Sequence, residues 1–134
     1  MNNQARVLVV DDNKANLELF VDFLAVGGYE CLNASTGEDA IEIARREHPD
    51  LVLLDIKLPG IDGLTVARIL KDNEETKDIK VVALTAYAMH SGHEIFRNGA
   101  FDGYISKPVS LKQFLQTVNE IIAHRSSPFK SNSQ

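Results

Sequence analysis

The sequence has little of three features that mark other classes of protein. Cys31 is the single cysteine among 134 residues, which excludes an intramolecular disulfide and a cysteine-based metal cluster. Lys and Arg number 14 against 19 Asp and Glu, and no run of basic residues could follow a phosphate backbone, so we expect no direct binding to nucleic acid. No apolar run approaches the roughly 20 residues that cross a bilayer, so we expect no membrane insertion and a cytoplasmic location.

Length and composition predict one compact domain. The chain is close to a typical domain length of about 150 residues. Its residues are 44% hydrophobic and 25% charged, as in an average soluble globular protein. We expect the domain to span residues 1–125, because residues 126–134 are polar and lack periodicity, which is typical of a disordered tail.

Short apolar runs alternate with amphipathic segments five times along the chain. The runs cover residues 7–10, 29–34, 51–54, 80–84 and 103–105. They have the length of strands, and several are continuously apolar, which indicates a parallel sheet covered on both faces.

The segments between these runs carry helix signals. Gly27 ends the first helix, Ser35 and Glu38 form a capping box for the second, and Asp62 caps the third. A weaker fourth helix is expected over residues 89–98, and Ser110 with Gln113 forms a capping box for the last.

Five β/α units joined by right-handed crossovers form a doubly wound α/β sandwich. We therefore predict a flavodoxin-like (βα)5 fold, with a five-stranded parallel sheet of order 2-1-3-4-5.

Polar residues follow the predicted strands at the edge of the sheet where such folds bind ligands. Asp11 and Asp12 follow the first strand, Asp55 the third, Thr85 the fourth and Lys107 the fifth. Carboxylates about 5 Å apart repel by roughly 3 kcal/mol per pair at an effective dielectric constant near 20. A hard divalent cation relieves this repulsion, and carboxylate oxygens are ligands that Mg²⁺ prefers, so we expect a Mg²⁺ site here.

Asp55 is the candidate nucleophile of this cluster. A carboxylate supported by a metal ion and a nearby lysine can attack phosphorus and form an aspartyl phosphate. Lys107 would share the charge of the phosphoryl oxygens with Mg²⁺, and Thr85 could donate a hydrogen bond to one of them. Pro108 follows Lys107 directly and is a candidate for a cis peptide bond that fixes this turn.

Four segments together resemble the receiver domain of bacterial two-component response regulators. They are VLVVDDN at 7–13, LLDIKLPGIDG at 53–63, ALTA at 83–86 and YISKP at 104–108. Each segment is weak evidence alone, but all four in this order are highly specific. The resemblance covers residues 6–125.

This resemblance implies a phosphorylation switch. Asp55 would accept a phosphoryl group from a phosphohistidine on a sensor histidine kinase or a histidine phosphotransfer protein. Asp11, Asp12 and Asp55 would hold Mg²⁺ with the backbone carbonyl of Lys57.

The resemblance also implies how phosphorylation would be transmitted. Thr85 would move toward the phosphoryl group, and Tyr104 would change rotamer with it. Because no output domain follows residue 125, we expect a stand-alone regulator that catalyses only its own phosphorylation and dephosphorylation. It would contact a downstream protein target through the fourth helix, fifth strand and last helix, around 87–98, 103–106 and 110–123.

Two other functions are compatible with the fold class but fit the residues less well. A Mg²⁺-dependent phosphohydrolase resembling the haloacid dehalogenases needs a second carboxylate two residues after the nucleophile, where this chain has Lys57. A flavin-binding protein needs a hydroxyl- and glycine-rich loop after the first strand, where Asp11 and Asp12 would repel the flavin phosphate.

Overall fold

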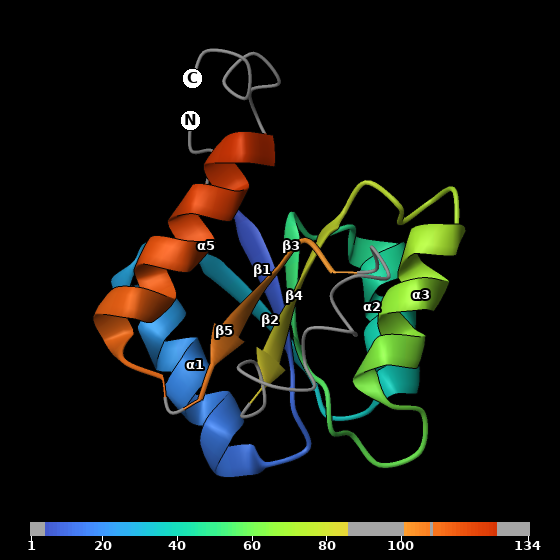
Figure 1. Cartoon of the computed structure of the whole chain (residues 1–134), viewed down its shortest axis with the longest axis horizontal. Helices are drawn as coiled ribbons and strands as arrows, with labels where there is room; N and C mark the ends of the chain where they lie inside the picture. Colours follow the sequence, from blue (N-terminus) through green and yellow to red (C-terminus); the bar gives the residue numbers. More distant parts are fainter. Residues whose placement is uncertain (1–4, 86–100, 108, 126–134) are drawn as a thin grey trace.

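The computed structural model describes residues 5–85, 101–107 and 109–125, which form a parallel sheet between two layers of helices (Figure 1). The strands are β1 (Arg6–Val10), β2 (Glu30–Ala34), β3 (Leu51–Asp55), β4 (Lys80–Thr85) and β5 (Gly103–Ser106). The five strands are parallel and lie in the order β2-β1-β3-β4-β5, so the predicted topology is confirmed.

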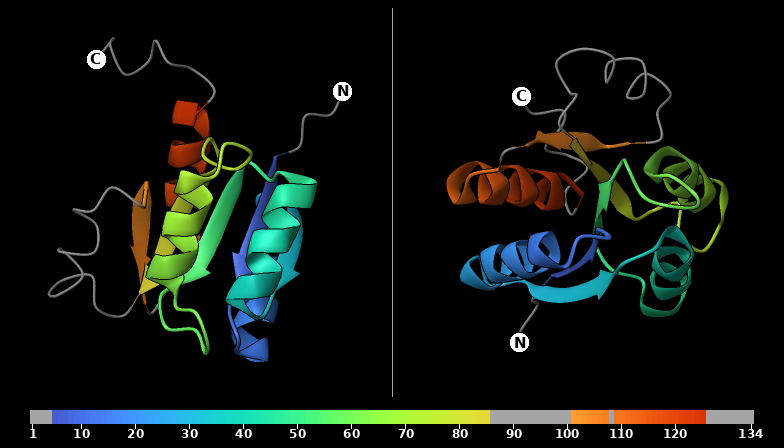
Figure 2. Two further views of the ribbon diagram at one scale, coloured as in Figure 1. Left: turned by 90° about the vertical axis from the view of Figure 1, so that its right-hand side faces the viewer. Right: turned by 90° about the horizontal axis from the view of Figure 1, so that it is seen from below.

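Helices cover both faces of this sheet. They are α1 (Lys14–Val26), α2 (Gly37–Glu47), α3 (Gly63–Asp72) and α5 (Leu111–Arg125). The end-on view in Figure 2 places α1 and α5 on one face and α2 and α3 on the other. The ring of Phe20 on α1 stacks on that of Phe114 on α5, with the ring centroids 5.5 Å apart.

The two helical layers explain why the strands are continuously apolar. Successive side chains of a strand point to opposite faces of the sheet. Along β1, Val7 and Val9 pack with the α1 and α5 side, whereas Leu8 and Val10 pack with the α2 and α3 side. All four are fully buried, so a polar side chain on either face of the strand would lose its solvation.

The helix caps follow the sequence signals with one correction. The Asp62 carboxylate accepts from the N–H of Thr65 at 2.9 Å at the start of α3, and Gly27 caps the end of α1, as predicted. At the start of α2, however, the capping residue is Thr36 and not Ser35. The Thr36 hydroxyl accepts from the N–H of Asp39 at 3.1 Å, so the helix begins one residue later.

The start of α5 agrees with the prediction, because the Ser110 hydroxyl accepts from the N–H of Gln113 at 3.2 Å. The predicted fourth helix over 89–98, the Pro108 peptide bond and the predicted tail over 126–134 lie outside the described residues. Among the helices that the structure describes, none has the length and apolar character needed to cross a bilayer.

Candidate functional site

Three carboxylates meet at the carboxyl ends of β1 and β3. Val10 pairs with Leu54 across these neighbouring strands, which brings the next residues, Asp11 and Asp55, side by side. Each of Asp11, Asp12 and Asp55 offers one oxygen, and these oxygens all lie within 4.8 Å of one another. Asp11 is fully buried and Asp55 is 8% exposed, whereas Asp12 is exposed to solvent.

Two asparagines fix the carboxylate of Asp11. Its Oδ1 accepts from the backbone N–H of Asn13 at 2.9 Å, and its Oδ2 accepts from the Asn16 side-chain amide at 3.3 Å. The backbone N–H of Asp11 donates to the carbonyl of Ala34 at 3.1 Å. Asn16 was missed from the sequence, although an amide side chain in the first turn of the helix that begins beside Asp11 is a usable signal.

The carboxylate of Asp55 is held from two sides. Its Oδ1 accepts from the backbone N–H of Lys57 at 3.1 Å, and its Oδ2 lies 3.5 Å from the Lys107 ammonium nitrogen. The same nitrogen is 3.9 Å from Oδ2 of Asp11. Lys107 reaches the cluster because its backbone N–H donates to the carbonyl of Thr85 at 2.9 Å, which continues the pairing of β4 with β5.

Burial makes the ionised form of Asp55 costly. Loss of solvation is the largest cause that raises the pKa of Asp55 above its usual value, and the charge of Asp11 raises it further. The Lys107 ammonium and the Lys57 N–H lower this pKa but do not cancel the effect of burial. Two full negative charges within 4.8 Å of each other repel by at least about 3.5 kcal/mol at an effective dielectric constant of about 20.

A divalent cation fits this donor set. The ligand atoms would be hard carboxylate oxygens at mutual distances that one ion can bridge. The exposed side at Asp12 leaves room for the waters that Mg²⁺ usually keeps. The cluster could therefore hold a metal ion.

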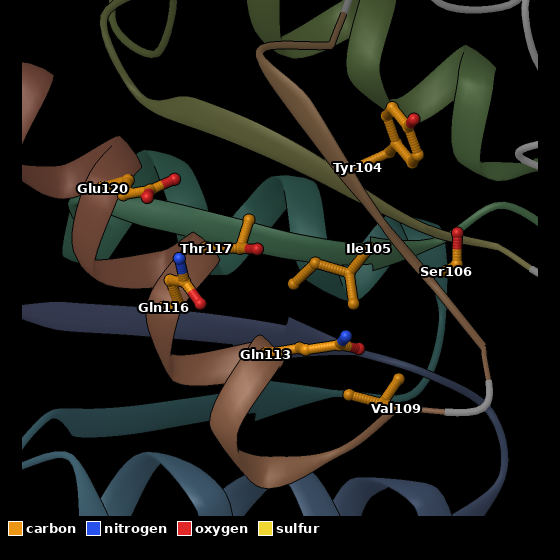
Figure 3. Close-up of a pocket in the computed structure, with 8 residues that line it drawn as sticks. All are labelled: Tyr104, Ile105, Ser106, Val109, Gln113, Gln116, Thr117 and Glu120. Atoms are coloured by element: carbon orange, nitrogen blue, oxygen red, sulfur yellow. The ribbon is translucent and has the colours of Figure 1, made fainter.

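Thr85 and Tyr104, the predicted switch residues, lie in different surroundings. Thr85 is 4% exposed at the end of β4, one residue beyond Leu84, which pairs with Asp55. Tyr104 is 47% exposed on β5, and its ring points away from the side of the strand that carries Ile105 (Figure 3). Thr85 thus ends the strand beside Asp55, whereas Tyr104 lies at the surface.

Residues 7–119 match the family model of the response regulator receiver domain. The chain belongs to this family. The receiver domain is 43% identical over 116 residues to the polar-differentiation response regulator DivK of Brucella ovis, an alignment covering 87% of this chain and 94% of that protein.

Solved structures resemble this receiver domain over nearly its whole length. A response regulator structure from Chloroflexus aurantiacus has a TM-score of 0.85 and 29% identity, covering 90% of this chain and 99% of that one. The receiver domain of a sensor histidine kinase from Pseudomonas aeruginosa has a TM-score of 0.83 and 26% identity, covering 90% and 98%. That neighbour has a magnesium ion coordinated in its active-site cleft.

A hollow of about 370 Å³ lies between β5 and α5, apart from the carboxylate cluster (Figure 3). Its lining residues are Tyr104, Ile105, Ser106, Val109, Gln113, Gln116, Thr117 and Glu120. The three clustered carboxylates are not among them, so this hollow is a surface feature of the receiver domain and not part of the metal site.

Proposed function

We propose that this receiver domain accepts a phosphoryl group on Asp55 from a phosphohistidine of a sensor histidine kinase or a histidine phosphotransfer protein. The observation that carries the proposal is the arrangement around one largely buried carboxylate. Asp55 lies among two further carboxylates and an ammonium group at the carboxyl end of the sheet. A metal ion and a lysine beside a buried carboxylate are what aspartyl phosphate formation requires.

The proposed Mg²⁺ ligands are the carboxylates of Asp11, Asp12 and Asp55 and the backbone carbonyl of Lys57. When bound, Mg²⁺ would neutralise charge on the carboxylates and on the phosphoryl oxygens. Asn13 and Asn16 would keep Asp11 in one orientation through the two hydrogen bonds that its oxygens accept.

In the proposed transfer, an oxygen of Asp55 attacks phosphorus. The new P–O bond forms as the P–N bond to the donor histidine breaks, and the imidazole leaves with the electron pair of that bond. The Lys57 N–H and the Lys107 ammonium orient the attacking carboxylate. Lys107 can then pair with a phosphoryl oxygen, because its ammonium lies beside the atom that carries the new group.

Phosphorylation would be reported through Thr85 and Tyr104 to a protein-binding surface. The Thr85 hydroxyl is proposed to donate to a phosphoryl oxygen, and Tyr104 to change rotamer in response. The hollow between β5 and α5 is proposed to be part of that surface. On this proposal the chain, with a domain over 1–125, acts as a stand-alone switch on a downstream protein and not as an enzyme with a separate substrate.

The test is phosphate incorporation with a small phosphoryl donor and Mg²⁺, followed by intact mass spectrometry. Wild type should gain one phosphoryl group, Asp55→Asn none, and wild type with a chelator none. Asp78→Asn is the matched control, because it makes the same change at an exposed carboxylate and should leave incorporation unchanged. Equal incorporation in wild type and Asp55→Asn would contradict the assignment.

A further inference from the structure

The loop of residues 56–62 joins β3 to α3 and begins directly after Asp55. One backbone hydrogen bond ties the start of the loop to β4, and another ties its two ends to each other. The N–H of Ile56 donates to the carbonyl of Leu84 at 3.3 Å, and the N–H of Gly63 donates to the carbonyl of Ile56 at 2.9 Å. These bonds fix the ends of the loop, so its middle must be positioned by other contacts.

The middle of the loop rests on the first turn of α2. A Cβ built on Gly37 would lie 2.6 Å from Cγ1 and 3.0 Å from Cδ1 of Ile61, and 2.7 Å from Cγ2 of Val66. A Cβ built on Gly60 would lie 3.8 Å from a carboxylate oxygen of Glu38, the residue after Gly37. The loop therefore packs against α2 at Gly37 and passes near Glu38.

Glycine at position 37 is needed for this contact and not for its backbone conformation. The described glycines with a positive φ are Gly28 and Gly60, so Gly37 has a backbone that alanine can adopt. Alanine is also the better helix former. The space that Ile61 and Val66 occupy is what excludes a side chain at position 37.

We infer that Gly37 is a positioning residue for the metal site, although it lies on a different element from every proposed ligand. Its missing side chain lets Ile61 seat against α2 and so sets the position of the loop that carries Lys57. The Lys57 N–H already binds Asp55 Oδ1, so a displaced loop would move both the Lys57 carbonyl and the orientation of Asp55. This inference rests on the proposed function, because Lys57 is a proposed Mg²⁺ ligand there.

The first test measures Mg²⁺ affinity by isothermal titration calorimetry in wild type and Gly37→Ala. We expect about tenfold weaker binding in the variant, at the lower end of the loss usual for residues that orient metal ligands. In metal-free protein, hydrogen exchange of the Lys57 amide should also become faster, because its bond to Asp55 weakens. Unchanged Mg²⁺ affinity would overturn the inference, whether or not the exchange rate changes.

Gly27→Ala is the matched control for general crowding. Its Cβ would lie 2.6 Å from Cδ2 of Leu115, the same distance as at Gly37, and the φ of Gly27 is −80°, which suits alanine. Gly27 caps the end of α1 and precedes β2, which begins at Glu30, so it lies toward the amino ends of the strands, whereas the carboxylates lie at their carboxyl ends. This variant should unfold at a lower temperature but bind Mg²⁺ as wild type does. A similar loss of Mg²⁺ affinity in Gly27→Ala would overturn the inference.

Two double variants test whether the effect passes through the loop. In an Ile61→Ala background the crowding atoms of Ile61 are gone and only Cγ2 of Val66 still crowds position 37. The contact that seats the loop is already lost there, so adding Gly37→Ala should weaken Mg²⁺ binding little further. In a Val66→Ala background Ile61 remains, so Gly37→Ala should still cost about tenfold. Equal losses of Mg²⁺ affinity in the two backgrounds would show that the effect of Gly37→Ala does not pass through Ile61 and the loop, and would overturn the inference.

The outcomes separate this inference from the proposed function. If wild type binds no Mg²⁺, the proposed function fails. If wild type binds Mg²⁺ and Gly37→Ala binds it equally well, the positioning role alone fails. If Gly37→Ala does not fold, Ile61→Ala removes the same contact from the loop side, and unchanged Mg²⁺ affinity in that variant would overturn the inference.

Discussion

Replacing Asp55 by asparagine should make the metal-free protein more stable at neutral pH. Asparagine has nearly the same shape, and its side-chain oxygen can still accept from the Lys57 N–H that now binds Asp55 Oδ1 at 3.1 Å. Lys107 keeps a carboxylate partner, because its ammonium lies 3.9 Å from Asp11 Oδ2. The substitution therefore removes a charge without removing the shape or the main hydrogen bond.

The size of the gain follows from three contributions. At an effective dielectric constant of about 20, Asp11 repels Asp55 by at least about 3.5 kcal/mol, because their oxygens lie within 4.8 Å, and Lys107 attracts it by about 4.7 kcal/mol at 3.5 Å. These two nearly cancel, and the exposed Asp12 adds only a screened repulsion. What remains is the cost of desolvating a carboxylate on a residue that is 8% exposed, so we expect Asp55→Asn to gain about 1–3 kcal/mol.

Urea unfolding followed by circular dichroism in the presence of a chelator measures this gain. Asp55→Asn should unfold at a higher urea concentration with an unchanged slope. The same substitution at the exposed Asp78 should change the free energy of unfolding by less than about 0.5 kcal/mol. The reasoning is refuted if metal-free Asp55→Asn is no more stable than wild type.

Three further predictions follow from the site and the core. Mg²⁺ at about 100 times its dissociation constant should stabilise wild type by about 2.7 kcal/mol, which thermal unfolding measures as a rise in the melting temperature. Asp12→Ala should lose most of this rise, and an equal rise in both proteins would contradict the metal site. Thr85→Ala should still accept phosphate on Asp55, but the NMR shifts of Tyr104 on adding beryllofluoride should be small; full-sized shifts would exclude Thr85 as the coupling residue. Burial raises the pKa of the Cys31 thiol to about 11 from 9.0, so thiolate at pH 8 is about 100-fold scarcer than at an ordinary thiol. Iodoacetamide should alkylate Cys31 in the folded protein more slowly than in urea-unfolded protein by at least that factor. The rate in the folded protein should rise about tenfold per pH unit below pH 11, and equal rates in folded and unfolded protein would contradict the burial of Cys31.

The strands could be predicted from short-range patterns, and the strand order from the common doubly wound arrangement of five β/α units, which places the first strand beside the third. A continuously apolar run of strand length such as 51–54 is typical of a strand covered on both faces, and the residues after parallel strands share one edge. Asp11 and Asp55 therefore lie together without any knowledge of the side-chain packing.

Other features depend on contacts between distant segments. Ser35 and Thr36 can both cap a helix, and the sequence alone does not choose between them. The structure selects Thr36, and Gly37 then packs against Ile61, a residue of another loop. Its role could not be found from sequence, because a glycine after a capping residue carries no signal of what lies against it.

The central claim is that Asp55 is the residue that carries the phosphoryl group, and locating that group tests it most directly. Wild-type protein is phosphorylated with a small donor and Mg²⁺ and then treated with borohydride, which reduces an aspartyl phosphate to homoserine. Peptide mass spectrometry then identifies the converted residue. The account predicts homoserine at position 55 and at no other aspartate. Conversion at Asp11 or Asp12, or phosphate that survives borohydride on a serine, threonine or histidine, would contradict it.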